Sequence, residues 1–244
     1  MVGPGRLASL HDINQYGRCK TSDKFFKVNK APETYSNEQC HSVIRREPWR
    51  RSSFLVGSIK IIGKLSWGAP EPTWSNEVIY YNLSRTSLMN TLTNIVVHHT
   101  NNSNSVSDNE KKQKTKGYAA LGYHFFINAD GSVYEGRPLE IMGSHAGRGK
   151  QAGALNDPDW GSVGIVLQGD FHHDDDWFKS NTAAKKQLNA LENLILGLNR
   201  KYNIGQLLMH REVNRGGPAT VCPGSYLAPL VINLRNKLGM KGKK

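Results

Sequence analysis

The chain has 244 residues, 38% of them hydrophobic, and a formal net charge of +12 at pH 7. Its length is sufficient for one domain of roughly 150 residues or more, with a substantial hydrophobic core, and an appendage. No stretch approaches the roughly 18 consecutive apolar residues of a membrane-spanning helix, so we expect no transmembrane segment.

The positive charge is concentrated early in the chain, because residues 1–66 hold 12 Lys and Arg against 5 Asp and Glu. This excess favours an anionic partner such as a nucleic acid, an acidic lipid or an acidic cell-wall polymer, although a solubilising surface explains any single cluster as well. The densest cluster, Arg45–Arg51, matches no nucleic-acid-binding motif and holds one aromatic residue. We therefore expect no nucleic acid partner.

The amino-terminal region shows neither a classical export signal nor a regular pattern. Met1–Lys20 is interrupted by charged residues and has no continuous apolar core, so any export would use another route. The first 60 or so residues mix Gly, Pro, Ser, Asn and Lys without a clear period. We predict that residues 1–66 form a basic extension or accessory region, that Gly68–Pro72 is a rigid connector, and that residues 67–244 form the main domain.

Three regions of the main domain have the pattern of strands. Asn94–His99 is rich in β-branched residues and ends in two histidines, as a buried strand does when its tip opens into a site. Gly122–Asn128 and Val133–Glu135 predict a β-hairpin, in which Asp130-Gly131 supplies the positive φ values of a tight turn. Ser162–Gln168 predicts a further strand.

Three regions have the pattern of helices. Asn101–Lys116 is polar and predicts a surface loop that leads into a charged helix. Thr182–Tyr202 has apolar residues at spacings of three and four, which give one buried stripe. Leu227–Leu238 shows a similar stripe, and Pro229 is tolerated there only near the first turn. Strands and helices interleave, so the predicted fold class is α/β, a central mixed β-sheet flanked by helices.

Two histidines and a cysteine lie in three short sequence motifs and suggest a metal centre. They are His98, His210 and Cys222. Imidazole and thiolate are zinc ligands, and three protein ligands leave one tetrahedral position open, as in catalytic zinc sites. His99 points to the opposite strand face from His98, so both cannot easily bind one ion. A lone histidine is more often structural, and only the set of three gives the metal prediction its weight.

The remaining cysteines and histidines leave alternatives open. Cys19 and Cys40 form either a disulfide or two ordinary thiols. His172 and His173, which precede Asp174–Asp176, suggest a second metal site, although a solvated acidic loop is favoured.

Eight motifs make the chain resemble the type 2 N-acetylmuramoyl-L-alanine amidases, a family that includes small phage amidase-lysozymes and the peptidoglycan recognition proteins. The resemblance covers about residues 67–238, and the order of the motifs makes it specific. The motifs are Trp67-Gly68-Ala69, Val96-Val97-His98-His99-Thr100, Gly122-Tyr123-His124-Phe125, Asp130-Gly131-Ser132-Val133-Tyr134-Glu135-Gly136-Arg137, Gly143-Ser144-His145-Ala146-Gly147, Ser162-Val163-Gly164-Ile165, His210-Arg211-Glu212 and Cys222-Pro223-Gly224.

The resemblance implies zinc-dependent cleavage of the amide between N-acetylmuramic acid and the first L-alanine of the peptidoglycan stem peptide. His98, His210 and Cys222 would hold Zn²⁺ in a surface groove, and a bound water would have its pKa lowered to about 7. Tyr123 would orient that water or stabilise the developing oxyanion. Thr220 stands where the phage enzymes have lysine and catalytic recognition proteins have threonine, so the oxyanion would receive a neutral hydrogen bond.

Two further features bear on proton transfer and substrate binding. The cytosolic recycling amidases carry a glutamate in the strand where this chain has Val166 and Leu167, so no carboxylate base is evident and the recycling branch is disfavoured. His145 and Arg148 are candidates for binding stem-peptide carboxylates, and equally for capping a loop. Cys222 is expected just before a helix that begins two residues later, whose dipole would favour its negative charge.

The sequence favours a bacteriolytic, antimicrobial amidase, either an endolysin or an effector delivered by a dedicated system. The first alternative is a peptidoglycan-binding recognition module without catalysis, but such modules typically lack the cysteine ligand. The second is a charge-driven nucleic-acid or membrane-surface protein, which leaves all eight motifs unexplained. We expect action on the cell wall, in the periplasm or outside the cell, after holin-dependent release or a secretion system. The basic residues 1–66 would concentrate the enzyme on an anionic envelope.

Overall fold

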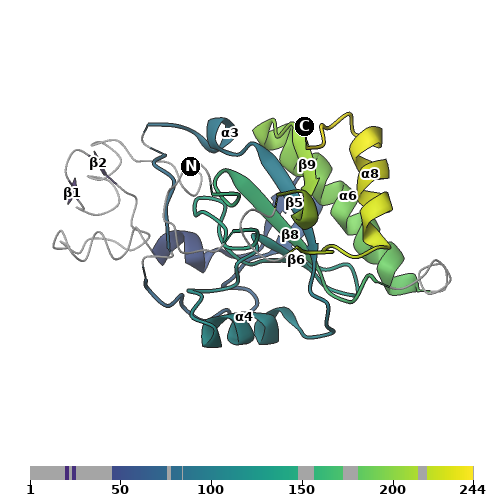
Figure 1. Ribbon diagram of the computed structural model, residues 1–244. Helices are drawn as coiled ribbons and strands as arrows, with labels where there is room; N and C mark the ends of the chain where they lie inside the picture. The colour runs from purple at the N-terminus through teal and green to yellow at the C-terminus, as the bar shows by residue number, and fades with distance from the viewer. Residues whose placement is uncertain are drawn as a thin grey trace. The chain divides into compact units, whose positions relative to one another are not determined.

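The computed structural model describes residues 20–21, 24–25, 46–75, 78–83, 85–147, 157–172, 181–213 and 219–243 (Figure 1). The chain forms two compact units, residues 1–51 and 52–244. In the first unit, β1 (Lys20–Thr21) pairs antiparallel with β2 (Lys24–Phe25), and the short 3-10 helix η1 spans Glu47–Arg50. Cys19 and Cys40, whose state was left open, lie outside the described residues.

The second unit contains a seven-stranded mixed sheet and five helices among its described residues. The strands are β3 (Phe54–Val56), β4 (Ile59–Ile62), β5 (Asn94–His99), β6 (Phe125–Ile127), β7 (Val133–Glu135), β8 (Ser162–Leu167) and β9 (Gln206–Met209). The helices are α3 (Leu88–Thr91), α4 (Val106–Thr115), α6 (Thr182–Tyr202), α7 (His210–Val213) and α8 (Leu227–Lys237). The strand order is β3-β4-β7-β6-β8-β5-β9, with β3/β4 and β6/β7 antiparallel and the other pairs parallel. The predicted α/β class is confirmed.

Side chains alternate between the two faces of the sheet, and each face has its own hydrophobic cluster. On one face, Val97 of β5 joins the inward residues of α6 and α8. On the other, Val166 of β8 packs with Val106 of α4. Figure 1 shows α4 apart from α6 and α8. The alternation therefore places His99 on the face covered by α6 and His98 on the face of α4.

Strands β3 and β4 lie in a region that we expected to be loosely built. They form a hairpin around Gly57, which has φ +60. A Cβ on Gly197 of α6 would lie 2.7 Å from the Val56 carbonyl oxygen, so the helix packs closely against this turn. The expectation of irregular structure is wrong for residues 54–62, because composition averaged over about sixty residues hides a short hairpin signal. The accessory role of residues 1–66 stays a prediction.

The segment after β4 is tied to the rest of the unit by a buried ion pair. The Nζ atom of Lys64 lies 2.9 Å from Oε2 of Glu110 on α4, and the two side chains are 1% and 0% exposed. Burial lowers the pKa of the Lys64 amine, an effect that Glu110 opposes. The indole N–H of Trp67 donates to the carbonyl of Glu135 on β7 at 2.9 Å. The start of the predicted connector is therefore anchored to both α4 and the sheet.

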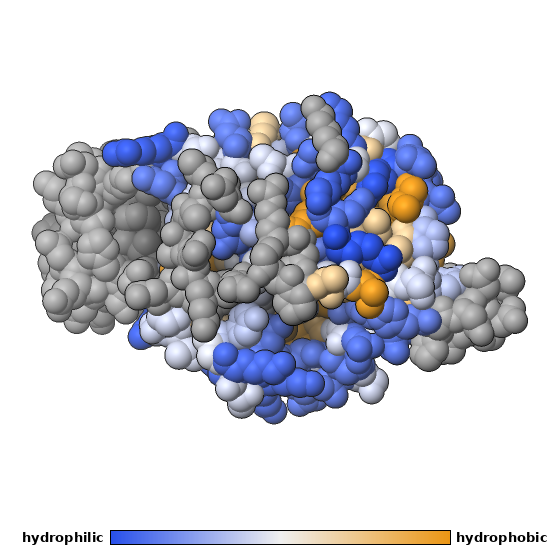
Figure 2. All heavy atoms as spheres, in the orientation of Figure 1, coloured by the Kyte–Doolittle hydropathy of each residue, from blue (hydrophilic) through white to orange (hydrophobic). Residues whose placement is uncertain are grey.

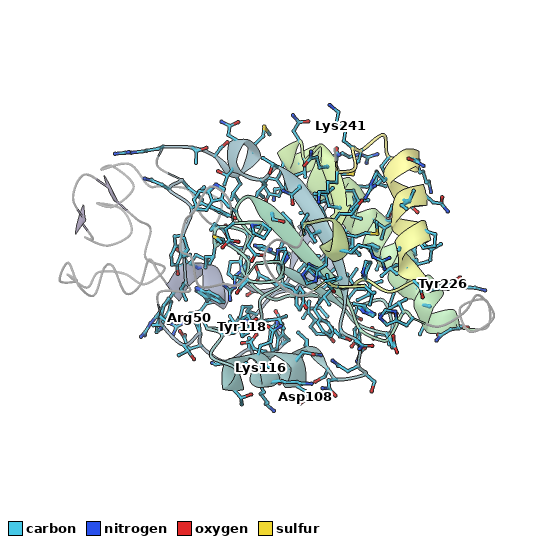
Figure 3. The ribbon with its side chains drawn as sticks, in the orientation of Figure 1. Arg50, Asp108, Lys116, Tyr118, Tyr226 and Lys241 are labelled. Carbon is cyan, nitrogen blue, oxygen red and sulfur yellow. The ribbon has the colours of Figure 1, made fainter. Side chains whose placement is uncertain are left out.

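The helices end close to where the sequence predicts, and their caps explain why. The Asn181 side chain accepts hydrogen bonds from the first backbone N–H groups of α6, and Asn203 ends the helix with φ 54. Ser105 caps α4, whose two ends are marked by Asp108 and Lys116 in Figure 3, with the charges that the helix dipole favours. The region of α4 is largely hydrophilic in Figure 2. None of the described helices is both long and apolar enough to cross a membrane.

The predicted hairpin is present as β6 and β7, with two differences. Strand β6 begins at Phe125, so Tyr123 precedes it. In the turn, only Gly131 has a positive φ, at +87, while the Asp130 side chain accepts a hydrogen bond from the Ser132 N–H at 2.8 Å. We predicted that Asp130 would have a positive φ, but it stabilises the turn through its carboxylate instead.

Candidate metal centre

The three predicted ligands lie together at one end of two neighbouring strands. β5 and β9 pair in parallel with Val97 opposite Met209, so the next residues, His98 and His210, stand side by side. Their ring centroids are 4.7 Å apart. Sγ of Cys222 lies 3.7 Å from Nδ1 of His98, and one ligand atom from each of the three lies within 4.8 Å of the others. The structure therefore brings all three together.

The protonation states of these groups suit a cation. Burial, with a smaller effect of His145 and His210, holds the pKa of His98 well below its usual value, and burial lowers the pKa of His210 to about 4. Both rings are therefore neutral at pH 7 and each offers a lone pair. Burial raises the pKa of the Cys222 thiol to about 11. A cation between the three groups would favour the thiolate, which is the form of cysteine that binds metals.

The helix that we expected just after Cys222 begins later, at Leu227, and the prediction about its dipole is wrong. Gly224 has φ +102, and a Cβ there would collide with the Phe171 backbone, so this part of the chain makes a turn packed against another loop. The dipole therefore does not act directly on the thiol. Burial dominates instead, and it raises the pKa where we expected it to be lowered.

Arg211 holds the loop of Cys222 against α7. Its backbone N–H donates to the Cys222 carbonyl at 3.1 Å, and its guanidinium donates to two further carbonyls of the loop, including that of Gly224 at 2.9 Å. The next residue, Glu212, accepts a hydrogen bond from Arg235 of α8 at 2.6 Å. The His-Arg-Glu motif thus contains a candidate ligand, an arginine that holds the Cys222 loop and a glutamate that pairs with the last helix.

The centre is buried on one side and open on the other. His98 is fully buried, whereas His210 and Cys222 are partly exposed. Next to the cysteine, Val221 is 64% exposed. An open side leaves room for a substrate, which a closed structural site would not.

Tyr123 and Thr220, the two predicted catalytic residues, contact His98 and Cys222. The ring of Tyr123 packs edge-on against His98, with 5.0 Å between centroids, and burial together with nearby Cys222 raises the pKa of its hydroxyl above the usual value. Oγ1 of Thr220 accepts a hydrogen bond from the Cys222 N–H at 3.2 Å. Their catalytic roles stay predictions.

Of the two predicted substrate-binding residues, His145 is described and Arg148 lies outside the described residues. The His145 side chain is fully buried, and its Nδ1 lies 3.0 Å from Nε2 of His98. Burial lowers the pKa of His145, although Asp159 at 3.4 Å opposes this. His145 therefore contacts the ring of His98, and its contact with substrate stays a prediction.

A second group of possible ligands, His99, Asp170 and His172, lies on the other side of β5. Burial lowers the pKa of His99 to about 4, so this ring is also neutral at pH 7. Its Nδ1 already accepts a hydrogen bond from the Phe171 N–H at 3.1 Å, however, and His172 is exposed. The other residues of the second metal site considered from the sequence lie outside the described residues. The first group is therefore the better metal centre.

Val166 and Leu167, which occupy the stretch where the resemblance led us to look for a carboxylate base, are both apolar and fully buried. Val166 of β8 stands opposite His98 in the parallel pairing of β5 and β8 and is fully buried. The three grouped ligands themselves include no carboxylate.

Sequence reasoning missed Arg211 and Asp159 as parts of the centre. Arg211 lies inside a motif that was noticed for its histidine, so its position was visible although its contacts were not. Asp159 stands in an Asp-Pro-Asp turn fourteen residues after His145, and no spacing rule links the two.

Comparison with known proteins matches residues 89–225 to the family described as N-acetylmuramoyl-L-alanine amidase. The chain is 30% identical over 187 residues to peptidoglycan-recognition protein SC2 of Drosophila melanogaster. The aligned region covers 70% of this chain and 84% of that protein. The structure of wild-type Drosophila PGRP-LB is similar with a TM-score of 0.50 at 27% identity, over 73% of this chain and 94% of that one. The structure of bumblebee PGRP-SA is similar with a TM-score of 0.53 at 23% identity, over 72% of this chain and 95% of that one. At this identity the similarity supports the fold alone.

The match to the family covers more than half of the chain, and it includes His98, His210 and Cys222. This agrees with the resemblance that the motifs indicate. The chain therefore belongs to the N-acetylmuramoyl-L-alanine amidase family.

Proposed function

We propose that this protein is a zinc-dependent amidase that cleaves the bond between N-acetylmuramic acid and L-alanine in peptidoglycan, with a bacteriolytic role. The observation that carries the proposal is the convergence of two neutral imidazoles and a thiol, His98, His210 and Cys222, in a chain of this family. The names of the relatives, peptidoglycan-recognition proteins, support peptidoglycan as the ligand.

The three side chains are a suitable donor set because imidazole nitrogen and thiolate sulfur are usual zinc ligands. When bound, zinc supplies a Lewis acid for the scissile carbonyl and makes hydroxide available from water at neutral pH. The protein must then hold the donors in place. The clamp of Arg211 on the Cys222 loop serves this purpose.

Tyr123 and Thr220 would act on the substrate as neutral hydrogen-bond donors. The raised pKa of the Tyr123 hydroxyl keeps its proton in place at neutral pH, so it can donate to negative charge that develops on the carbonyl oxygen. Thr220 uses an oxygen lone pair to accept from the Cys222 N–H, which leaves its own O–H available for donation. Neither contributes a full positive charge, so we expect a lower rate than with a lysine at position 220.

The alternative function is recognition of peptidoglycan without cleavage. Cys222 favours the enzyme, because a binding surface has no need for a thiol beside two imidazoles. Both functions would use the same open side of the centre, so binding alone does not separate them.

Mass spectrometry of purified peptidoglycan after digestion tests the proposal. We expect the wild type to release free stem peptides that begin with L-alanine, and the variant Cys222→Ser to release none while it still binds the wall. Wild-type products cut between sugars would contradict the amidase assignment. Wall binding without any product from the wild type would support the recognition function instead.

A further inference from the structure

His145 is a buried group that the proposed reaction does not use. Its side chain is 0% exposed, and its Nδ1 lies 3.0 Å from Nε2 of His98. His98 in turn directs its other nitrogen, Nδ1, to Sγ of Cys222 at 3.7 Å. The two ring nitrogens of His98 thus have different partners. Nδ1 faces Cys222, and Nε2 faces His145 on the other side of the ring.

The position of His145 is fixed by a buried carboxylate. Asp159 is fully buried, and its Oδ1 accepts the backbone N–H groups of His145 and Ala146 at 2.9 and 2.8 Å. Its Oδ2 accepts the N–H of Gly147 at 2.8 Å. The loop therefore wraps around one carboxylate, which also lies 3.4 Å from Nδ1 of the His145 ring. Three charge-assisted hydrogen bonds make this a rigid support.

Two glycines provide the space for the imidazole. A Cβ on Gly143 would lie 2.8 Å from Nε2 of His145, and a Cβ on Gly164 of β8 would lie 2.6 Å from its Cγ. Real Cβ atoms essentially never come so close, so the ring occupies space that both glycines leave open. Gly143 and Gly164 belong to two separate sequence motifs, and the position of one ring explains both.

The hydrogen bonding of His145 depends on which nitrogen of His98 binds the metal. A histidine that gives the Nδ1 lone pair to a metal carries its proton on Nε2, and in His98 this atom faces Nδ1 of His145. His145 must then carry its own proton on Nε2. That atom is buried and meets no hydrogen-bond partner at normal distance and angle among the described residues, although the ring also interacts with the backbone of Ser162. The Nδ1 atom of His145 lies closer to Nε2 of His98, at 3.0 Å, than to Oδ1 of Asp159, at 3.4 Å, so the contact with His98 is the main interaction of this nitrogen.

We propose that His145 is a positioning residue of the metal centre. It accepts the Nε2 proton of His98 and so holds Nδ1 of that ring toward His210 and Cys222, with Asp159 as its support. The inference rests on the proposed function only in that the bound ion is zinc.

Zinc affinity, measured by competition with a chelating indicator, tests the inference without substrate. Removal of a ligand's outer partner typically costs roughly 10- to 100-fold in metal affinity, and we expect this loss for His145→Leu. His145→Asn should recover most of the affinity, because its side-chain oxygen lies close to where Nδ1 was and accepts the same proton. His145→Gln, which leaves that place empty, replaces the leucine variant if the latter does not fold.

His124→Leu is the matched control. His124 is also fully buried, accepts the Gly164 N–H at 3.0 Å and packs edge-on against His145 with 5.9 Å between ring centroids. Its loss therefore disturbs the packing around His145 but keeps the nitrogen that faces His98. This variant should lose stability but keep wild-type zinc affinity. The absorption spectrum of the Co²⁺-loaded protein should change in His145→Leu and not in His124→Leu.

Wild-type affinity in His145→Leu would overturn the inference, and so would equal losses in the leucine and asparagine variants. The proposed function fails separately. A wild type that binds zinc but releases no stem peptide contradicts the amidase activity and leaves the role of His145 standing.

Discussion

His98 and His99 are neighbours on one strand, and both are buried and neutral, yet their ring nitrogens have different partners. The nitrogens of His98 face Cys222 and His145, while Nδ1 of His99 accepts a backbone N–H. The strand alternation sends them to opposite faces of the sheet. Burial and protonation are therefore not what selects a ligand. The partner of each ring nitrogen decides which histidine can bind an ion.

Replacement of each histidine gives the largest expected contrast. His98→Ala removes a predicted ligand and should cost more zinc affinity than the roughly 10- to 100-fold that is typical when the outer hydrogen-bond partner of a ligand is removed. His99→Asn keeps an acceptor for the Phe171 N–H and should retain about one zinc per chain. Metal analysis after dialysis measures both. Equal zinc content in the two variants would remove the distinction between the faces.

Replacement of Arg211 should have an intermediate effect on zinc affinity. Arg211→Ala removes the clamp on the Cys222 loop, and we expect a loss of roughly 10-fold in zinc affinity. Arg211→Lys should not restore it, since an ammonium group cannot reproduce the planar fork that reaches several carbonyls. Full recovery by lysine would show that only the charge matters.

The smallest expected effect is a pH dependence of the free energy of unfolding, to which the histidines on both faces of the sheet contribute. The folded pKa is about 4 for His99 and His210 and well below the usual value for His98, against about 6.5 in the unfolded chain. Between these values the unfolded state binds more protons, so the free energy of unfolding should fall as pH drops from about 6.5 to 4. Urea unfolding in chelator at several pH values measures this.

His99→Asn provides the control for this titration. It removes one of the titrating groups, so its unfolding free energy should fall less steeply over the same pH range than that of the wild type. Equal slopes would show that His99 is not among the groups responsible.

The sequence contained enough information for the four strands β5, β6, β7 and β8 and for the long helices, because each leaves a local pattern. It did not reveal β3, β4 or β9, which are short. The β-branched run at Asn94–His99 and the apolar stripe of Thr182–Tyr202 are each made by residues close together in the sequence. The strand and the helix that they predicted have the same bounds in the structure. The ligand set came from motifs of the family. The Asp159 support and the pKa of Cys222 could not be predicted, because both depend on which distant groups pack around a side chain.

The position of β3 and β4 sets a limit on how short a working fragment can be. A fragment that starts at Trp67, the predicted domain boundary, would lose both strands and expose the edge of β7, which invites pairing with other chains. It would also lose Lys64 and leave the carboxylate of Glu110 buried without its cation. A fragment that starts at Ser52 keeps the whole sheet, so it is the natural minimal form for crystallisation and engineering.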